Sequence, residues 1–145
     1  MPIAPLRRTD EQARHLIEQA LAVPVHRFLG VELMSLVPGE ARCQIIIGEN
    51  AATPSNTLHG GVLSLVLEIA AYAALMPMID ADKIPTTIDF HNQPMRSVAL
   101  GDKLEIVAKV LRHGRRTASC EVATFVEGRL MSKGLILKAL LDIVD

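Results

Sequence analysis

The chain has 145 residues, a formal net charge of −1, and a hydrophobic share of 50%. This length suffices for one domain with its own core, and the apolar content argues against disorder. Because a near-neutral charge gives no general attraction for nucleic acid or anionic membranes, we expect neither as a partner. Aromatic residues supply only 3% and tryptophan is absent, so the core must be aliphatic.

The two cysteines, Cys43 and Cys120, lie far apart in the sequence, and neither has a Cys or His neighbour at metal-ligand spacing. This pattern predicts no metal site. The first ten residues carry two arginines but lack the apolar run of a signal peptide. We therefore expect a cytoplasmic protein with reduced thiols.

The first predicted element is a short amphipathic helix. Thr9 and Gln12 have the spacing of a capping box, and the apolar stripe behind them includes Leu16 and Ile17. Pro24 follows that stripe, so the helix is expected to end before it.

Extended segments are predicted on both sides of a long apolar helix. Two strands joined by a Pro-Gly turn precede the helix, and four strands follow it. Short glycine-bearing turns make the last three strands a meander. The six predicted strands cover residues 31–36, 41–47, 86–95, 103–111, 116–126 and 130–141. Residues 135–142 fit a helix equally well, and that assignment stays open.

The long apolar segment runs from Gly60 to Ile79 and contains one charged residue, Glu68. It is long enough to cross a membrane, but its central acid, Pro77 and the lack of a basic flank favour a buried core helix. Such a helix needs cover on nearly all sides. We predict an α+β fold over residues 1–145, in which a curved antiparallel sheet wraps the helix and residues 1–27 pack on it as a helical segment.

The polar residues of this helix lie on one line. Gly61, Ser64, Glu68 and Tyr72 are spaced by three, four and four positions, so they share one face. A glutamate in such a helix is costly unless it is paired, hydrogen-bonded or used in a reaction. Glu68 is therefore either a functional carboxylate or a structural one neutralised by an arginine across an interface.

The start of the helix, His59-Gly60-Gly61, offers a second candidate feature. Backbone N–H groups at the first helical positions have no acceptor within the helix, and the helix dipole favours negative charge there. Without side chains, a ligand carbonyl can approach closely, as an oxyanion hole requires. The two glycines could equally serve close packing at a tight turn.

Helix geometry separates the two features. Gly60 and Glu68 are eight residues apart, which is roughly 12 Å along a helix at about 1.5 Å per residue. One small carbonyl group cannot contact both within a single chain. If both serve one reaction, the protein is a homodimer with two sites at a two-fold interface.

The segment from Thr57 to Glu68, with His-Gly-Gly and an acid nine positions after the histidine, resembles hotdog acyl-CoA thioesterases of the phenylacetate-degradation and 4-hydroxybenzoyl-CoA type. Residues 87–91, 101–102, 114–116 and 127–128 resemble later parts of that family, so the likeness covers roughly residues 28–140. It implies a hotdog fold and hydrolysis of an acyl-CoA thioester without a cofactor, in a homodimer or a dimer of dimers.

The resemblance also implies roles for individual residues. Gly60 would donate its N–H to the thioester oxygen, and Glu68 of another subunit would act as nucleophile or general base. Thr87 would orient the water or the carboxylate, and His59 would brace the loop. The family often has Asn or Gln where this chain has Thr53, which puts efficiency in doubt.

Substrate contacts are predicted less directly. Arg115 and Arg116 belong to a basic hairpin that also contains Lys109 and Arg112, and guanidinium groups suit the phosphates of CoA. The other candidates for substrate binding are Asn56, Gly61, Tyr72 and His91.

Each of these residues also has a purely structural alternative. The arginines could belong to a solvated turn, and Tyr72 and His91 could be core residues. A non-catalytic acyl-CoA-binding module and a hotdog dehydratase or hydratase are the alternative functions. The sequence does not specify the acyl group.

Overall fold

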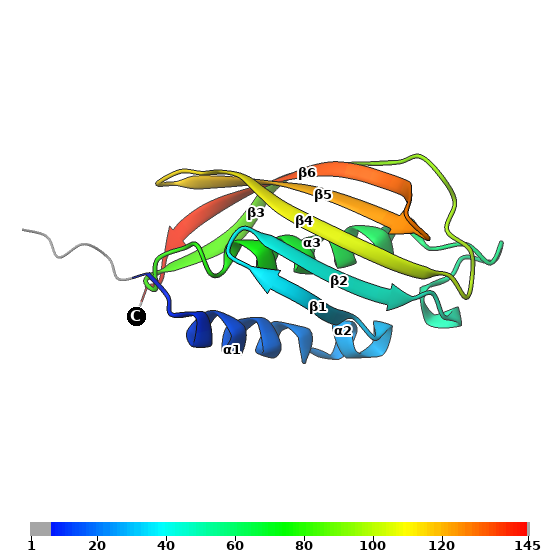
Figure 1. Ribbon diagram of the computed structural model, residues 1–145, viewed down its shortest axis with the longest axis horizontal. Coiled ribbons are helices and arrows are strands. Elements are labelled where there is room, and N and C mark those ends of the chain that lie inside the picture. The colour runs from blue at the N-terminus through cyan, green and yellow to red at the C-terminus, as the bar shows by residue number, and fades with distance from the viewer. Residues whose placement is uncertain (1–6, 145) are drawn as a thin grey trace, which may run out of the picture.

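The structure is a computed structural model that describes residues 7–144. Its elements are α1 (Asp10–Leu21), α2 (Pro24–Leu29), β1 (Glu32–Val37), β2 (Glu40–Ile46), a 3₁₀ turn (Glu49–Ala51), α3 (Gly60–Leu75), β3 (Lys83–Pro94), β4 (Lys103–His113), β5 (Thr117–Val126) and β6 (Arg129–Asp142). The strands form one antiparallel sheet in the order β1-β2-β4-β5-β6-β3. Figure 1 shows this sheet curving over α3, with α1 and α2 below β1. The predicted α+β hotdog architecture is confirmed.

The N-terminal helix forms as its capping box predicts. Thr9 Oγ1 accepts a hydrogen bond from the Gln12 N–H at 3.1 Å, and Gln12 Oε1 accepts one from the Thr9 N–H at 3.0 Å. Ala13 and Ile17 are fully buried and join the core, so the apolar stripe attaches α1 to the rest of the molecule.

The second helix, α2, is not predicted from the sequence, where Pro24 marks only the end of α1. In the structure Pro24 opens α2 at a first-turn position, where the N–H that proline lacks would have no acceptor within the helix. This short helix ends at Gly30, whose φ of 71° is the left-handed conformation that glycine adopts easily.

The six strands lie where the sequence predicts them, with boundaries shifted by up to three residues. Residues 135–142, which fitted either helix or strand, form part of β6. This strand is paired on both sides, with β5 and with β3. The same pairing extends β3 back to Lys83, which lies opposite Asp142. Pairing with neighbouring strands thus determines the secondary structure of a segment whose local composition fits either helix or strand.

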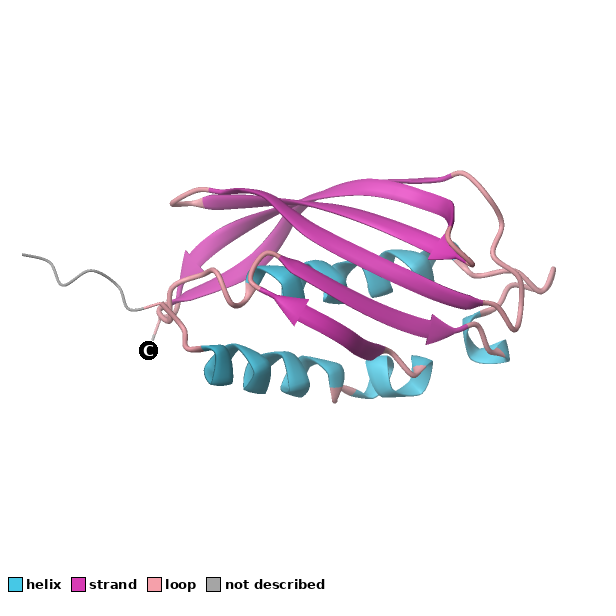
Figure 2. Ribbon diagram, viewed as in Figure 1, coloured by secondary structure: helices cyan, strands magenta, loops and turns pink. Residues whose placement is uncertain are grey.

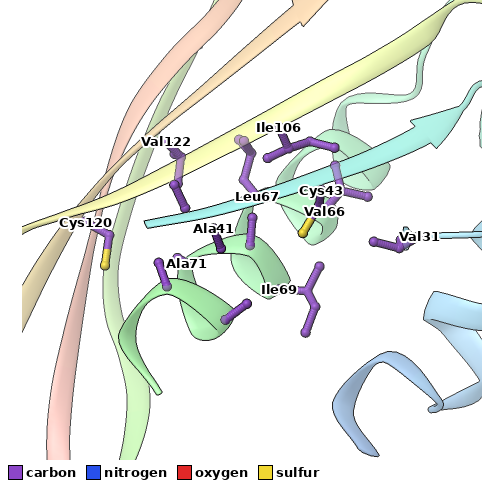
Figure 3. Close-up of a cluster of buried hydrophobic side chains, with 14 of the residues drawn as sticks. Val31, Ala41, Cys43, Val66, Leu67, Ile69, Ala71, Ile106, Cys120 and Val122 are labelled. Atoms are coloured by element: carbon purple, nitrogen blue, oxygen red, sulfur yellow. The ribbon is translucent and has the colours of Figure 1, made fainter. Parts of the chain in front are cut away.

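The core gathers around α3, whose nine buried residues are all apolar. In Figure 3, Leu67 and Ala71 of α3 cluster with Ile106 of β4 and Val122 of β5. Within the part of the chain that the structure describes, no helix is both long and apolar enough to cross a membrane. The membrane-span reading of this segment therefore finds no support.

One side of α3 stays partly uncovered. We call this side the open strip and define it by its partly exposed residues, Gly61, Ser64, Leu65, Glu68 and Tyr72. Their spacing places them on one helix face. The sheet thus leaves this face of α3 without full cover.

Strand β3 forms one edge of the sheet (Figure 2), and its register contains a bulge. The register between β3 and β6 shifts between Thr87 and Asp89, so Ile88 is an extra, exposed residue. Regular alternation would send Thr87 and Phe90 to opposite faces of the strand. With the bulge, both side chains are half-buried and face the inner side of the sheet.

Candidate active site

Glu68 is held in a triangle of hydrogen bonds midway along α3. Its Oε2 accepts from Thr87 Oγ1 at 2.7 Å and from Lys138 Nζ at 2.6 Å. Lys138 Nζ also donates to Thr87 Oγ1 at 2.6 Å. These three side chains come from a helix and two strands that are far apart in the sequence.

The sheet positions the two partners of Glu68. Thr87 on β3 and Lys138 on β6 lie directly opposite one another in the strand register, and the bulge after Thr87 preserves that alignment. The Lys138 side chain is 6% exposed, whereas the Glu68 side chain is 32% exposed. The carboxylate therefore lies at the edge of the interior, and its Oε1 has no hydrogen-bond partner among residues 7–144.

Lys138 is not among the site residues predicted from the sequence, although the strand pattern contains a signal for it. On β6 the buried positions alternate through Ile136, Lys138 and Leu140, so strand periodicity puts the lysine on the core side. A buried ammonium requires a partner. The neutralising group for Glu68 is therefore a lysine of the same chain, in place of the arginine across an interface that the structural alternative expected.

The start of α3 leaves one backbone donor free. His59 is the N-cap residue, and its Nδ1 accepts a hydrogen bond from the Gly61 N–H at 2.9 Å. Within the described part of the chain, the Gly60 N–H has no acceptor. A side chain at Gly60 would meet nothing within 4 Å. The free N–H therefore adjoins open space at the positive end of the helix dipole.

This open space continues into a groove of about 290 Å³. Its walls are formed by the start of α3 and the segment after β3, with Thr57, Leu58, Gly60, Leu63, Pro94, Met95, Arg96, Ser97 and Val98 as lining residues. Glu68 is not among them. Within one chain the structure thus separates the free N–H from the carboxylate, as the rise along α3 predicts.

The loop before α3 contains Asn56 and Thr53. Asn56 is exposed and has a left-handed φ of 58°, a conformation that Asn tolerates better than most residues. Thr53 Oγ1 lies 2.9 Å from Thr57 Oγ1, and the Thr53 N–H donates to the Thr57 carbonyl at 2.7 Å. Thr53 therefore fastens the loop through its own hydrogen bonds, at the Gly60 end of the helix.

Tyr72 and His91 have different surroundings. Tyr72 is half-buried on the open strip, one turn beyond Glu68. Burial raises the pKa of its phenol, and the nearby Arg8 guanidinium partly offsets that effect. His91 is exposed, and alternation along β3 points it away from the side on which Phe90 packs.

The hairpin between β4 and β5 carries Arg115 and Arg116 at its exposed tip. Arg115 lines a hollow together with Asp80 and Asp82, so its surroundings have mixed charge. Lys109 lines a different hollow with Glu121 on the sheet. The basic cluster predicted from the sequence is therefore divided between two places.

Both cysteines are buried free thiols. Burial raises the pKa of Cys43 to about 12 and that of Cys120 to about 11. The charges of Lys138 and Glu68 have opposing, smaller effects on the pKa of Cys120, which places this thiol near the Glu68 triangle.

The fold agrees with the comparisons to known proteins. The family model of the thioesterase superfamily matches residues 55–132, which is more than half of the chain. The chain therefore belongs to the thioesterase superfamily, whose members cleave thioesters. The resemblance to hotdog-fold thioesterases noted in the sequence is confirmed.

Individual relatives agree with this assignment. Human acyl-coenzyme A thioesterase 13 is 27% identical over 111 residues, which cover 74% of this chain and 79% of the human one. The crystal structure of zebrafish thioesterase superfamily member 2 has a TM-score of 0.80 at 25% identity and covers 92% of this chain and 99% of its own. A phenylacetic acid degradation protein from Thermus thermophilus shares the fold, with a TM-score of 0.74 at 24% identity over 81% of this chain and 99% of its own.

Proposed function

We propose that the protein hydrolyses an acyl-CoA thioester to a free acid and CoA, and that the reaction uses no cofactor. The observation that carries the proposal is the Glu68 carboxylate, which is held through one oxygen while the other has no partner within residues 7–144. It is also the only charged residue on the open strip of α3. The relative named as an acyl-coenzyme A thioesterase supports the choice of substrate class.

The proposed site combines residues of two subunits. The thioester oxygen accepts a hydrogen bond from the Gly60 N–H of one subunit, and that donor stabilises the negative charge that develops there. The carbonyl carbon lies against Glu68 Oε1 of the other subunit. Thr87 holds the carboxylate in place, while the contact between His59 and Gly61 fixes the helix start.

Two routes lead from this arrangement to the same products. In one, Oε1 attacks the carbonyl carbon, the C–S bond breaks, and water hydrolyses the resulting anhydride. In the other, Oε1 takes a proton from a water molecule as its oxygen attacks the carbonyl carbon, and the C–S bond then breaks. In both routes CoA leaves as a thiolate, a good leaving group that needs little help from a general acid.

The surface of the chain supports a two-fold partner beside Glu68. The open strip leaves part of α3 uncovered, and β3 is an unpaired sheet edge with Ile84 and Ile88 exposed on it. An exposed apolar edge strand is prone to pair with another chain. A homodimer joined along these features would cover the apolar surface and bring the two half-sites together.

Substrate contacts belong to the same proposal. The groove beside Gly60 would receive part of the substrate near the scissile bond. Asn56 and Gly61 are proposed contacts because they are the chain neighbours of the lining residues Thr57 and Gly60. Arg115 and Arg116 would contact the phosphates of CoA, although the neighbouring Asp80 and Asp82 weaken their combined field. Tyr72 and His91 are the proposed contacts of the acyl group.

A second candidate function is a non-catalytic acyl-CoA-binding module. The ion pair between Glu68 and Lys138 favours it, because that pair would also account for a purely structural glutamate. The two functions differ in what loss of the carboxylate does. An enzyme loses turnover, whereas a binding module has no turnover to lose.

The test is a thiol-release assay on short, medium, long and aromatic acyl-CoAs. Glu68→Gln keeps the size of the side chain and an oxygen for both hydrogen bonds, and Glu18→Gln on α1 is an exposed control. We expect the wild type and the control to hydrolyse at least one acyl-CoA, and Glu68→Gln to lower kcat by about 10²–10⁴-fold. Absence of turnover above background for every substrate would overturn the proposal.

A further inference from the structure

The proposed reaction assigns no role to Lys138, a buried lysine whose ammonium group contacts Glu68. We propose that Lys138 is a positioning residue for that reaction. Its ammonium group fixes Glu68 Oε2 and Thr87 Oγ1 together, so that Oε1 is the oxygen that reacts. This inference rests on the proposed function and adds a third side chain to its site.

The direction of the hydrogen bonds follows from the chemistry of the three groups. A lysine ammonium only donates, so both 2.6 Å contacts of Lys138 Nζ are donations. Thr87 Oγ1 therefore accepts from Lys138 and uses its own hydrogen to donate to Glu68 Oε2 at 2.7 Å. Glu68 Oε2 thus accepts twice, which an ionised carboxylate does most readily.

Burial makes this arrangement specific. Lys138 is 4% exposed, and a buried ammonium without a partner is strongly unfavourable. The lysine therefore has two partners within reach and little freedom to leave them. Because Oε2 is held from two sides, the carboxylate cannot turn without breaking both contacts, and Oε1 keeps a fixed direction.

A second lysine on the same strand shows that this placement is particular to position 138. Lys133 also lies on β6 and forms an ion pair, with Glu121 at 3.4 Å, but its side chain is 54% exposed. It is five residues from Lys138, so alternation sends the two to opposite faces of the sheet. Lys133 is therefore a matched control with the same charge on the same element.

The neighbours of Glu68 show that Lys138 supplies the positive charge beside this carboxylate. Thr87 of β3 is uncharged, and Cys120 of β5 stays neutral because burial raises its pKa to about 11. The same holds for Cys43 of β2, with a pKa of about 12, and for the phenol of Tyr72 on α3, whose pKa is raised. The strand β4 faces α3 with apolar residues such as Ile106. Among residues 7–144, Lys138 is the only cation within ion-pair distance of Glu68.

The experiment compares Lys138→Met, Lys138→Gln, Lys138→Arg and Lys133→Met with the wild type. For each variant it records kcat and KM on the best acyl-CoA and the thermal unfolding curve. Methionine removes the charge and the donors, glutamine keeps a donor without charge, and arginine keeps the charge. Lys138→Gln decides the question if Lys138→Met does not fold.

For Lys138→Met we expect kcat to fall by about 100-fold with little change in KM, because the reacting oxygen is displaced while the substrate still binds. Lys138→Arg, which keeps the charge and the donors, should retain more of the wild-type kcat than Lys138→Met, and Lys133→Met should match the wild type.

Two other results have distinct meanings. A wild type that is active while its folded Lys138→Met and Lys138→Gln variants keep the same kcat overturns this inference alone. A wild type that hydrolyses no acyl-CoA overturns the proposed function, and this inference falls with it.

Discussion

Gly60 lies at the first position of α3 with open space where a side chain would be. Its backbone is not in the left-handed region, so an alanine fits without strain and favours the helix slightly. We predict that Gly60→Ala leaves the free energy of unfolding unchanged or raises it by up to about 1 kcal/mol. The new methyl group would occupy the approach to the N–H, so kcat/KM should fall by about 100-fold or more.

Denaturant unfolding and the thiol-release assay measure both effects. Gly61→Ala is an informative comparison, because its Cβ would lie 3.1 Å from the His59 ring. That variant should disturb the helix start and lower stability as well as activity. Wild-type turnover in Gly60→Ala would show that no substrate oxygen binds at this N–H.

The buried cysteines predict a pH dependence of stability. An unfolded thiol ionises near pH 8.5, whereas Cys43 in the folded protein has a pKa of about 12. As the pH rises above 8.5, the unfolded chain therefore releases a proton that the folded chain keeps. This difference lowers the free energy of unfolding by about 1–2 kcal/mol between pH 8.5 and 10.

The comparison with Cys43→Ala isolates this contribution from the other groups that titrate in the same range. Urea unfolding at pH 7.5 and pH 10 should show a smaller loss for the variant than for the wild type. An equal loss in both proteins would show that the Cys43 thiol ionises as readily in the fold as in the unfolded chain.

At the scale of residues, part of the candidate site was predictable from the sequence. Glu68 and Gly60 stood out because an acid and a pair of glycines are unusual in an apolar helix, and Thr87 followed from the family resemblance. Lys138 did not stand out, because lysines in strands are usually exposed and its partner is 70 residues away. Only the register between β3 and β6 brings Lys138 to Thr87 and Glu68.

At the scale of elements, α1 depends on its N-terminal cap. Thr9 Oγ1 accepts the Gln12 N–H, which would otherwise have no partner in the helix. We predict that Thr9→Ala lowers the free energy of unfolding by about 1 kcal/mol, while Thr9→Ser costs less because it keeps the hydroxyl. Denaturant unfolding of the two variants checks this, and equal stability of Thr9→Ala and Thr9→Ser would contradict it.

Element types were predictable because the hydrophobic patterns are strong, but some boundaries were not. The start of β3 at Lys83 depends on pairing with the end of β6, which no local pattern reveals. Helix α2 was missed because a proline that ends one helix can also begin the next. The bulge at Ile88 is equally invisible in the sequence, yet it aligns Thr87 with Lys138.

At the scale of the whole molecule, the sheet covers α3 from one side and leaves the open strip and the β3 edge uncovered. The helix itself keeps Gly60 and Glu68 apart, so in the proposed mechanism each chain supplies two half-sites. That mechanism therefore depends on a second copy that brings its Gly60 to this Glu68. Helix spacing made this separation predictable from the sequence, whereas the shape of the uncovered surface required the fold.

A mixed dimer of two inactive variants tests that dependence most directly. Gly60→Ala and Glu68→Gln subunits with different affinity tags are produced together, and the species carrying both tags is isolated. A two-fold dimer of this kind has one site with both residues intact and one site with both replaced. We predict that it recovers about half of the wild-type turnover, while each parent variant alone stays inactive. A doubly tagged species as inactive as its parents, or no such species at all, would contradict a site shared between subunits.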